Sequence, residues 1–252
     1  MIPRKEISLR SRRHNHDENV WIHPFSGRIS NWFTWVFVNI GMSANQVTQL
    51  CALAGVASAL VLGFDTLSMV IASFILFRLH VLFDVVDGEV ARYRNQISRF
   101  GSYWDQLMHV AVYPLILMCM VVGRLLNDAS MVVAVFGMVG MIGKGLDLAA
   151  KSAYFRVLYS SGPREEPLPI EPTKQVSSNS IKRGIGLLLN LRGFDALLFF
   201  YGAAYLMDGS WMGLAVRDWV LGAYSANFTL VALVRAVLIP KRNNVPMRKD
   251  FR

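Results

Sequence analysis

Three aspartates and one histidine lie at the ends of two neighbouring apolar segments: Asp84, Asp87, Asp105 and His109. Asp84 and Asp87 are three residues apart, and Asp105 and His109 are four apart, so each pair shares one face of a helix. Ionisable groups inside a membrane-spanning segment are costly and usually functional. Converging carboxylates suit Mg²⁺ together with substrate phosphates, and two such ions can clamp both oxygens of a phosphoryl displacement. The spacing therefore predicts a metal-assisted phosphoryl-transfer site where these two helices pack antiparallel.

Small and basic residues surround the carboxylates. Gly88, Ala91 and Gly101 would let a ligand or a backbone approach closely. Arg92 and Arg94 are candidates to meet a phosphate oxygen. Glu89 has two interpretations of equal weight, a part in the site or an ion pair with Arg92 at i,i+3.

The composition indicates an integral membrane protein, because 54% of the 252 residues are hydrophobic and the mean hydropathy is +0.37. The net charge of +9 is concentrated in the two tails. Basic flanks beside apolar spans favour anionic lipid headgroups over nucleic acid, so we expect membrane lipids and no nucleic-acid partner.

The predicted fold is all-α, with six transmembrane helices and an N-terminal amphipathic helix in the membrane interface. We expect a basic cytoplasmic tail over 1–30, the interfacial helix over 31–42, a membrane domain over 43–240, and a basic cytoplasmic tail over 241–252. Ser43 and Gln46 form a candidate capping box at the entry to the first span. The spans are placed at 44–63, 66–91, 101–123, 130–156, 193–208 and 214–238, with a cytoplasmic loop over 157–192.

The orientation follows from the distribution of Lys and Arg. The basic residues gather in both tails, after the second span and in the 157–192 loop, whereas the turns near Asp65, Asp128 and Asp208 carry few. Both termini and the carboxylate-bearing helix ends are therefore predicted to be cytoplasmic. For a bacterial protein, this would be the inner membrane.

The stretch from Asp84 to His109 resembles the signature of the CDP-alcohol phosphatidyltransferase family. That signature reads Asp, two residues, Asp-Gly, two residues, Ala-Arg, eight residues, Gly, three residues, Asp, three residues, Asp. Every spacing is kept, and His109 replaces the last Asp. The entry to the first span, Ala44-Asn45-Gln46-Val47-Thr48, also looks like the family's Pro-Asn-x-x-Thr, with Ala in place of Pro.

The resemblance implies a reaction and a set of site residues. The family transfers a substituted phosphate from a CDP-linked donor, such as CDP-diacylglycerol, to an alcohol acceptor and releases CMP, in phospholipid biosynthesis, and many members are homodimers. It implies that Asp84, Asp87 and Asp105 hold two Mg²⁺ or Mn²⁺ ions. The CDP-binding residues that it implies are Asn45, Thr48, Gly88, Ala91, Arg92 and Gly101.

His109 departs from the family, in which the last Asp is thought to be a metal neighbour and the general base. A neutral imidazole can accept a proton from the acceptor hydroxyl near pH 7, so a working transferase remains possible. The change also removes a negative charge, which weakens metal binding or shifts it toward Mn²⁺ or Zn²⁺. The alternatives are a catalytically impaired family member that binds nucleotide or lipid and, from a different class, a small transporter.

Two further histidine and lysine features have competing interpretations. His80 lies one turn before Asp84, and we expect it to be a satisfied buried histidine and not a catalytic one. Lys144 and Lys151 share a face of the fourth span with Asp147. They either form an ion-pair ladder or contact the phosphate of the acceptor or the donor.

Overall fold

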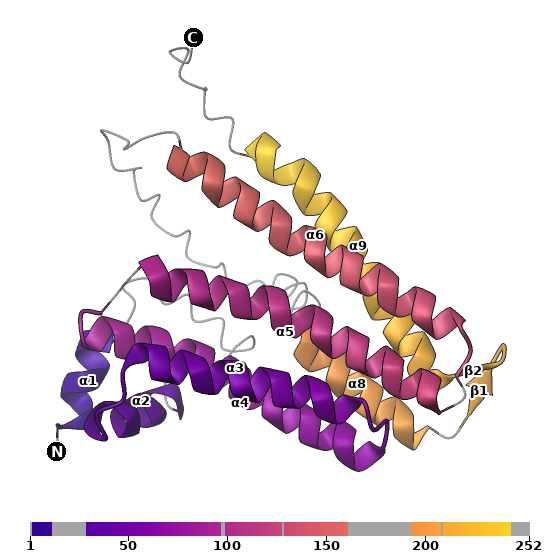
Figure 1. Ribbon diagram of the computed structural model, residues 1–252, viewed down its shortest axis with the longest axis horizontal. Coiled ribbons are helices and arrows are strands. Elements are labelled where there is room, and N and C mark those ends of the chain that lie inside the picture. Colours follow the sequence, from indigo (N-terminus) through magenta and orange to yellow (C-terminus); the bar gives the residue numbers. More distant parts are fainter. Residues whose placement is uncertain are drawn as a thin grey trace, which may run out of the picture.

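The computed structural model describes residues 2–11, 29–96, 99–127, 129–160, 193–207 and 209–242. Its long helices lie beside one another (Figure 1). The elements in chain order are α1 (Arg4–Ser11), α2 (Ile29–Asn39), α3 (Ala44–Leu62), α4 (Leu67–Tyr93), α5 (Arg99–Leu126), α6 (Val132–Ser160), α8 (Phe194–Leu206), β1 (Ser210–Trp211), β2 (Leu214–Ala215) and α9 (Val216–Arg242).

Five of the helices are long and apolar enough to cross a membrane, namely α3, α4, α5, α6 and α9. The mostly helical, multi-pass membrane fold predicted from hydropathy is thus confirmed in outline. The expected fifth span over 193–208 corresponds to α8, whose 13 residues would cover only about 20 Å at 1.5 Å per residue. A bilayer core is about 30 Å thick, so α8 is shorter than the spans around it.

The entry to α3 follows the predicted local chemistry. The Ser43 hydroxyl accepts a hydrogen bond from the backbone N–H of Gln46, and the Gln46 side chain accepts one from the backbone N–H of Ser43. This capping box satisfies orphan N–H groups and sets the first turn of α3. Thr48, in the following turn, contacts Asp87 near the end of α4.

Three boundaries differ from the sequence prediction. Residues 4–11 of the tail form α1, because Ile7 is wholly buried and anchors a helix that its own polar sequence would not stabilise. α6 continues through residues 157–160, which we had placed in the loop, and the rest of that loop lies outside the described residues. Residues 214–215 pair as a strand with residues 210–211 through a turn at Met212 and Gly213, both with positive φ.

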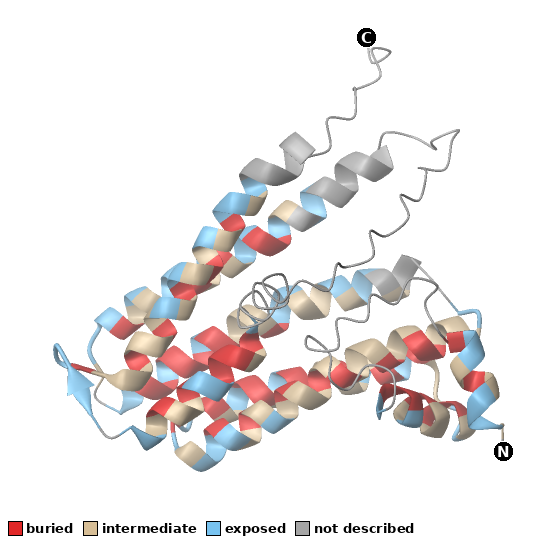
Figure 2. Ribbon diagram, turned by 180° about the vertical axis from the view of Figure 1, so that it is seen from behind, coloured by how far each residue is buried: buried red, intermediate tan, exposed pale blue. Residues whose placement is uncertain are grey.

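The helices pack as two groups. α3, α4 and α5 lie together with α1 and α2 at one end, whereas α6 and α9 lie side by side and diverge from α5 toward that end (Figure 1). The α6–α9 contact is close at Gly143, where an added Cβ would lie 2.5 Å from the backbone nitrogen of Thr229. Buried residues gather where the two groups meet, and a second buried cluster lies at the N-terminal end, where α1 and α2 pack on α4 (Figure 2).

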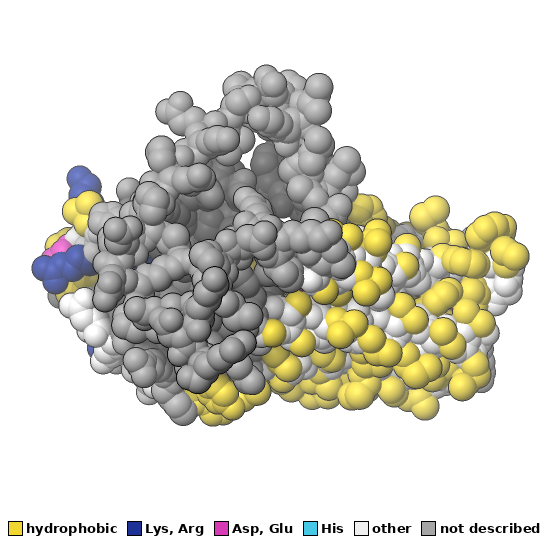
Figure 3. Space-filling model, turned by 90° about the horizontal axis from the view of Figure 1, so that it is seen from above, with side chains coloured by type: hydrophobic (Ala, Val, Ile, Leu, Met, Phe, Trp, Pro, Cys, Tyr) yellow, Lys and Arg dark blue, Asp and Glu magenta, His cyan; other side chains and the backbone are white. Residues whose placement is uncertain are grey.

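The outer surface of the spans is apolar. Exposed hydrophobic side chains cover the helices on the face shown in Figure 3, in keeping with helices that contact lipid. The ends of the bundle differ in their polar residues. We call the end of α4 and the start of α5 the motif end, and the end near the α3–α4 turn the far end.

Candidate active site at the motif end

Asp84 on α4 and Asp105 and His109 on α5 converge at the motif end, although the two helices do not pack closely on each other as the sequence predicted: each of them packs on α3. Nε2 of His109 lies 3.4 Å from Oδ1 of Asp84 and 3.5 Å from Oδ1 of Asp105. One ligand atom from each residue lies within 4.8 Å of the other two. We call these three residues the acidic cluster, and their geometry is that of a candidate metal-binding site.

The acidic cluster is partly open, and His109 is its one member that can carry a positive charge. The side chains of Asp84, Asp105 and His109 are 29%, 37% and 21% exposed. Within the described part of the chain, neither carboxylate forms an ion pair with Lys or Arg. Like charges this close repel one another, and a bound cation would relieve that repulsion. The donor set of two carboxylate oxygens and one imidazole nitrogen suits Mn²⁺, Mg²⁺ or Zn²⁺.

Asp87 lies one turn further along α4, outside the acidic cluster. Its Oδ2 accepts a hydrogen bond of 2.7 Å from the Thr48 hydroxyl on α3. Thr48 was expected at the edge of the site, and the structure brings it to a motif carboxylate. Asp87 is therefore positioned by α3, the helix on which both α4 and α5 pack.

The ring of His109 is fixed by other rings. It stacks on Tyr113 at 5.3 Å between centroids, and it meets His80 edge-on at 6.1 Å. Nδ1 of His109 is buried and has no hydrogen-bond partner among the described residues. Nε2 is therefore the nitrogen available to the acidic cluster. Sequence reasoning did not single out Tyr113, although its i,i+4 spacing from His109 placed it on the same helix face.

His80 has a structural environment. Its side chain is wholly buried, and Nδ1 lies 2.9 Å from the carbonyl oxygen of Cys51. The thiol of Cys51 donates to the carbonyl of His80 at 3.3 Å. These contacts join α3 to α4. His80 is buried as expected, but it is only half satisfied, because its Nε2 has no hydrogen-bond partner among the described residues.

Glu89 and Arg92 do not pair with each other, which corrects one of the two sequence interpretations. The two carboxylate oxygens of Glu89 accept hydrogen bonds from Ser30 at 2.9 Å and Thr34 at 2.5 Å, both on α2. Nε of Arg92 donates instead to the carbonyl of Ser11, at 2.7 Å. The partners come from residues 55 to 81 positions earlier in the chain, so i,i+3 spacing could not reveal them.

The remaining candidate residues lie at different depths in the bundle. Gly88, Ala91 and Gly101 lie at the motif end and are partly buried, and Asn45 there is exposed. Arg94 donates to the carbonyl of Val38 at 3.2 Å. Lys144 lies deeper, with Nζ 4.7 Å from the Tyr113 ring centroid and 3.8 Å from the Asp147 carboxylate. The side chain of Lys151 lies outside the described residues.

Lys144 and Asp147 form part of the expected ion-pair ladder on α6. Asp147 is also held by Arg235 of α9, whose Nη1 lies 2.5 Å from Oδ1. The aromatic stack continues from Tyr113 to Phe194 at 4.9 Å and from Phe194 to Phe228 at 5.0 Å. Lys144 therefore lies beside a row of stacked rings that begins at His109.

Comparisons with known proteins place the motif end in a family. Residues 41–161 match the family described as CDP-alcohol phosphatidyltransferase. Among curated protein sequences, none matches this chain significantly.

Two solved structures share the fold. Both are of phosphatidylinositol phosphate synthase (PgsA1) from Mycobacterium tuberculosis, one with CDP-DAG bound and one in complex with manganese and citrate. Each is 19% identical to this chain, with a TM-score of 0.56 over 83% of this chain. The matched regions cover 94% and 89% of those chains. At this identity the likeness is one of fold.

Proposed function

We propose, from the match of residues 41–161 to the CDP-alcohol phosphatidyltransferase family, that the chain is a transferase of this kind. It transfers a substituted phosphate from a CDP-linked donor such as CDP-diacylglycerol to an alcohol acceptor, with release of CMP. In this proposal α8 completes a six-span bundle, both termini are cytoplasmic, and the protein is a homodimer. The interfacial position of α2 belongs to the same proposal.

The observation that carries the proposal is the convergence of Asp84, Asp105 and His109 inside the family-matched segment. Their ligand atoms lie within 4.8 Å of one another. Carboxylates placed this closely, with no Lys or Arg partner in the described part of the chain, are suited to divalent cations. The solved structure with manganese shows that a protein of this fold has been crystallised with such an ion.

Asp84, Asp105 and the neighbouring Asp87 would hold the divalent ions, with Mg²⁺ or Mn²⁺ as candidates. When bound, such ions polarise a diphosphate and offset the charge on a leaving nucleotide. Thr48 would keep the Asp87 carboxylate turned toward α3, through the 2.7 Å hydrogen bond. Gly88, Ala91, Arg92 and Gly101, with Asn45 and Thr48, would line the CDP pocket.

His109 would serve as the general base. Its Nε2 faces the acidic cluster, and its ring is held by Tyr113 and His80. A base must lie within hydrogen-bond reach of the acceptor hydroxyl, and a fixed ring lowers the cost of holding that geometry. The alternative is a catalytically impaired member that binds nucleotide or lipid, favoured by the one motif position at which His109 replaces Asp.

Lys144, Lys151 and Arg94 would contact the phosphate of the acceptor or of the donor. Lys144 lies over Tyr113, which stacks on His109, so its ammonium group is one ring removed from the proposed base. A cation there would attract an acceptor that carries its own phosphate.

The test is CMP release by the purified protein in mixed micelles. CDP-diacylglycerol is supplied with Mg²⁺ or Mn²⁺ and a panel of acceptors: glycerol phosphate, inositol phosphate, serine and a lipid alcohol. We expect release that is lost in Asp105→Asn and falls strongly in His109→Ala. Glu6→Gln is the control, because this carboxylate is 44% exposed on α1, where it pairs with Arg10 at 3.7 Å. It should keep activity within a few-fold of the wild type.

Two results would contradict the proposal. If no donor gives CMP, while His109→Asp does, the impaired alternative is correct and His109 is not a working base. Metal-independent ion flux in liposomes, without CMP release, would favour the transporter.

A further inference from the structure

The helices α1 and α2 form a collar on the motif end of α4, and we call them the N-terminal collar. Both lie outside the family-matched residues 41–161. Ile7 of α1 is wholly buried in a cluster with Val86 and Val90, which flank Asp87 and Glu89 on α4. The N-terminal collar therefore packs against the part of α4 that carries Asp87 and Glu89 (Figure 1).

Hydrogen bonds fix α1 on α2. The backbone N–H of Ile2 donates to Oδ1 of Asn39 at 2.8 Å, and Nε1 of Trp35 donates to the carbonyl of Ile2 at 2.9 Å. Nδ2 of Asn31 donates to the Ser8 hydroxyl at 3.3 Å. α2 is itself held on α4 by Glu89, through Ser30 and Thr34. The position of α1 is thus set relative to α4.

The C-terminus of α1 contacts a motif residue. The carbonyl of Ser11, the last residue of α1, accepts the 2.7 Å hydrogen bond from Nε of Arg92. Ser11 is 1% exposed, so the contact is shielded from water. Carbonyls at a helix C-terminus carry partial negative charge and attract a guanidinium. The same guanidinium lies over Gly88, where an added Cβ would be 3.2 Å from Nη1.

We propose that α1 positions Arg92 for the CDP-linked donor: the Ser11 carbonyl holds the guanidinium over Gly88, the residue after Asp87, so that it meets a donor phosphate. This inference rests on the proposed function and deepens it. Arg92 is the binding residue, and Ile7 and Ser11 are positioning residues. A guanidinium held from one side loses less side-chain entropy when it binds phosphate.

The experiment undocks α1 by Ile7→Asp, with Leu9→Asp as the matched control. Both residues are aliphatic and two positions apart, but Ile7 is 0% exposed whereas Leu9 is 77% exposed. The full-length protein is assayed in mixed micelles at a fixed acceptor concentration, and CMP binding is measured by calorimetry. Losing one charge-assisted hydrogen bond predicts a rise of about tenfold in KM for CDP-diacylglycerol and in Kd for CMP. We expect kcat to change less than twofold, and Leu9→Asp to match the wild type.

A double mutant distinguishes positioning from general destabilisation. Arg92→Lys removes the Nε donor and the planar fork, so it should raise KM by itself. If α1 acts through Arg92, Ile7→Asp should add less than twofold in the Arg92→Lys background. Should Ile7→Asp fail to fold, Ile7→Ala replaces it, with a several-fold rise in KM expected.

The outcomes separate this inference from the proposed function. A lower kcat with unchanged KM, or effects of Ile7→Asp and Arg92→Lys that multiply fully, would overturn the positioning role. Wild-type CMP binding that Ile7→Asp leaves unchanged would overturn it while leaving the transferase proposal intact. A wild-type protein that binds no CMP and releases none would overturn both.

Discussion

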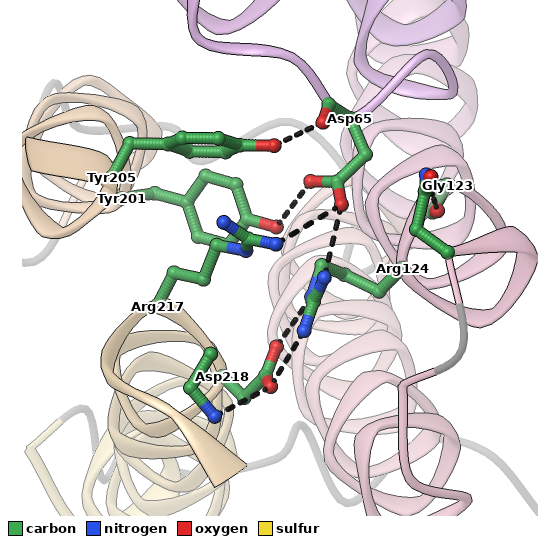
Figure 4. Close-up of polar contacts among 9 residues, drawn as sticks. Asp65, Gly123, Arg124, Tyr201, Tyr205, Arg217 and Asp218 are labelled. Carbon is green, nitrogen blue, oxygen red and sulfur yellow. Dashed lines mark hydrogen bonds and ion pairs between the residues drawn. The ribbon is translucent and has the colours of Figure 1, made fainter. Parts of the chain in front are cut away.

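The two ends of the bundle use the same residue types in opposite ways. At the far end, Arg124 donates to both carboxylate oxygens of Asp218, at 2.6 and 2.9 Å, and to Asp65 at 3.0 Å (Figure 4). Tyr201 and Tyr205 also donate to Asp65, and Arg217 lies 3.5 Å from its carboxylate. We call these six residues the far-end network. At the motif end, His109 is the one partner of Asp84 and Asp105 among the described residues that can carry positive charge.

The burial of the two sites follows their charge balance. The side chains of Asp65 and Asp218 are each 2% exposed, and that of Arg124 is 6% exposed, whereas Asp84 and Asp105 are 29% and 37% exposed. Carboxylates can be deeply buried when arginines compensate for their desolvation. Carboxylates that must receive a cation and a substrate stay accessible. The far-end network is therefore structural, whereas the acidic cluster has the accessibility that a binding site requires.

The largest effect that would test this contrast is Arg124→Met. It leaves Asp65 and Asp218 buried without their main partner, and breaking a buried ion pair in this way costs about 3–5 kcal/mol. We expect a large fall in the thermal unfolding temperature in detergent. Arg10→Met is the control, because its ion pair with Glu6 is surface-exposed and such pairs contribute about 0–1 kcal/mol. If both variants unfold at the same temperature, the far-end network does not stabilise the fold.

Asp84→Asn should act in the opposite direction at the acidic cluster. Without divalent ions we expect equal or higher thermal stability, because a carboxylate is removed from beside Asp105. With Mn²⁺ at about 100 times its Kd, the wild type should gain about 2.7 kcal/mol, and the variant should lose most of this gain. The unfolding temperature with Mn²⁺ and with EDTA measures both effects. Destabilisation of the metal-free variant would show that Asp84 is structural.

The sequence was informative where the signal was local. Hydropathy placed the long helices, and the Ser43–Gln46 spacing identified the cap of α3. The i,i+4 spacing put Asp105 and His109 on one face of α5, where both lie near Asp84, whereas Asp87 contacts α3 instead. These signals depend on backbone geometry over one or two turns. They therefore survive without any knowledge of the tertiary structure.

The partners of buried polar groups were not predictable in the same way. Asp65 was read as part of a turn, yet its partners Arg124 and Tyr201 lie 59 and 136 residues away. Likewise, α1 is a polar segment whose helix depends on docking Ile7 beside α4. Periodicity identifies which face of a helix is buried, but not which residue of another helix it meets. The pairing of Asp87 with Thr48 was hidden for the same reason.

The environment of Glu89 combines features of the two sites. Glu89 is buried, like the carboxylates of the far-end network, but its hydrogen-bond partners are hydroxyl groups and not arginines. Glu89→Leu would leave the hydroxyls of Ser30 and Thr34 without their acceptor, at a cost of about 1–3 kcal/mol. Glu89→Gln keeps an acceptor oxygen, so it should cost less than about 1 kcal/mol. Thermal unfolding of both variants measures this. A larger loss in Glu89→Gln would mean that the negative charge itself holds α2 on α4.

The smallest expected effect concerns Thr48, whose one hydroxyl proton has two candidate acceptors. Its Oγ1 lies 2.7 Å from Oδ2 of Asp87 and 3.1 Å from the carbonyl of Ala44. The shorter bond to a charged acceptor should dominate. Thr48→Val keeps the side-chain shape and removes the hydrogen bond, which is worth about 1 kcal/mol. We therefore expect CMP release at limiting Mn²⁺ to fall about fivefold.

Thr48→Ser is the matched control, because it keeps the hydroxyl and loses only a methyl group. It should remain within twofold of the wild type at the same Mn²⁺ concentration. Equal activity in Thr48→Val and the wild type would mean that the proton is donated to Ala44 on the same helix. Asp87 would then be oriented by α4 alone, and no side-chain hydrogen bond from α3 would fix its carboxylate.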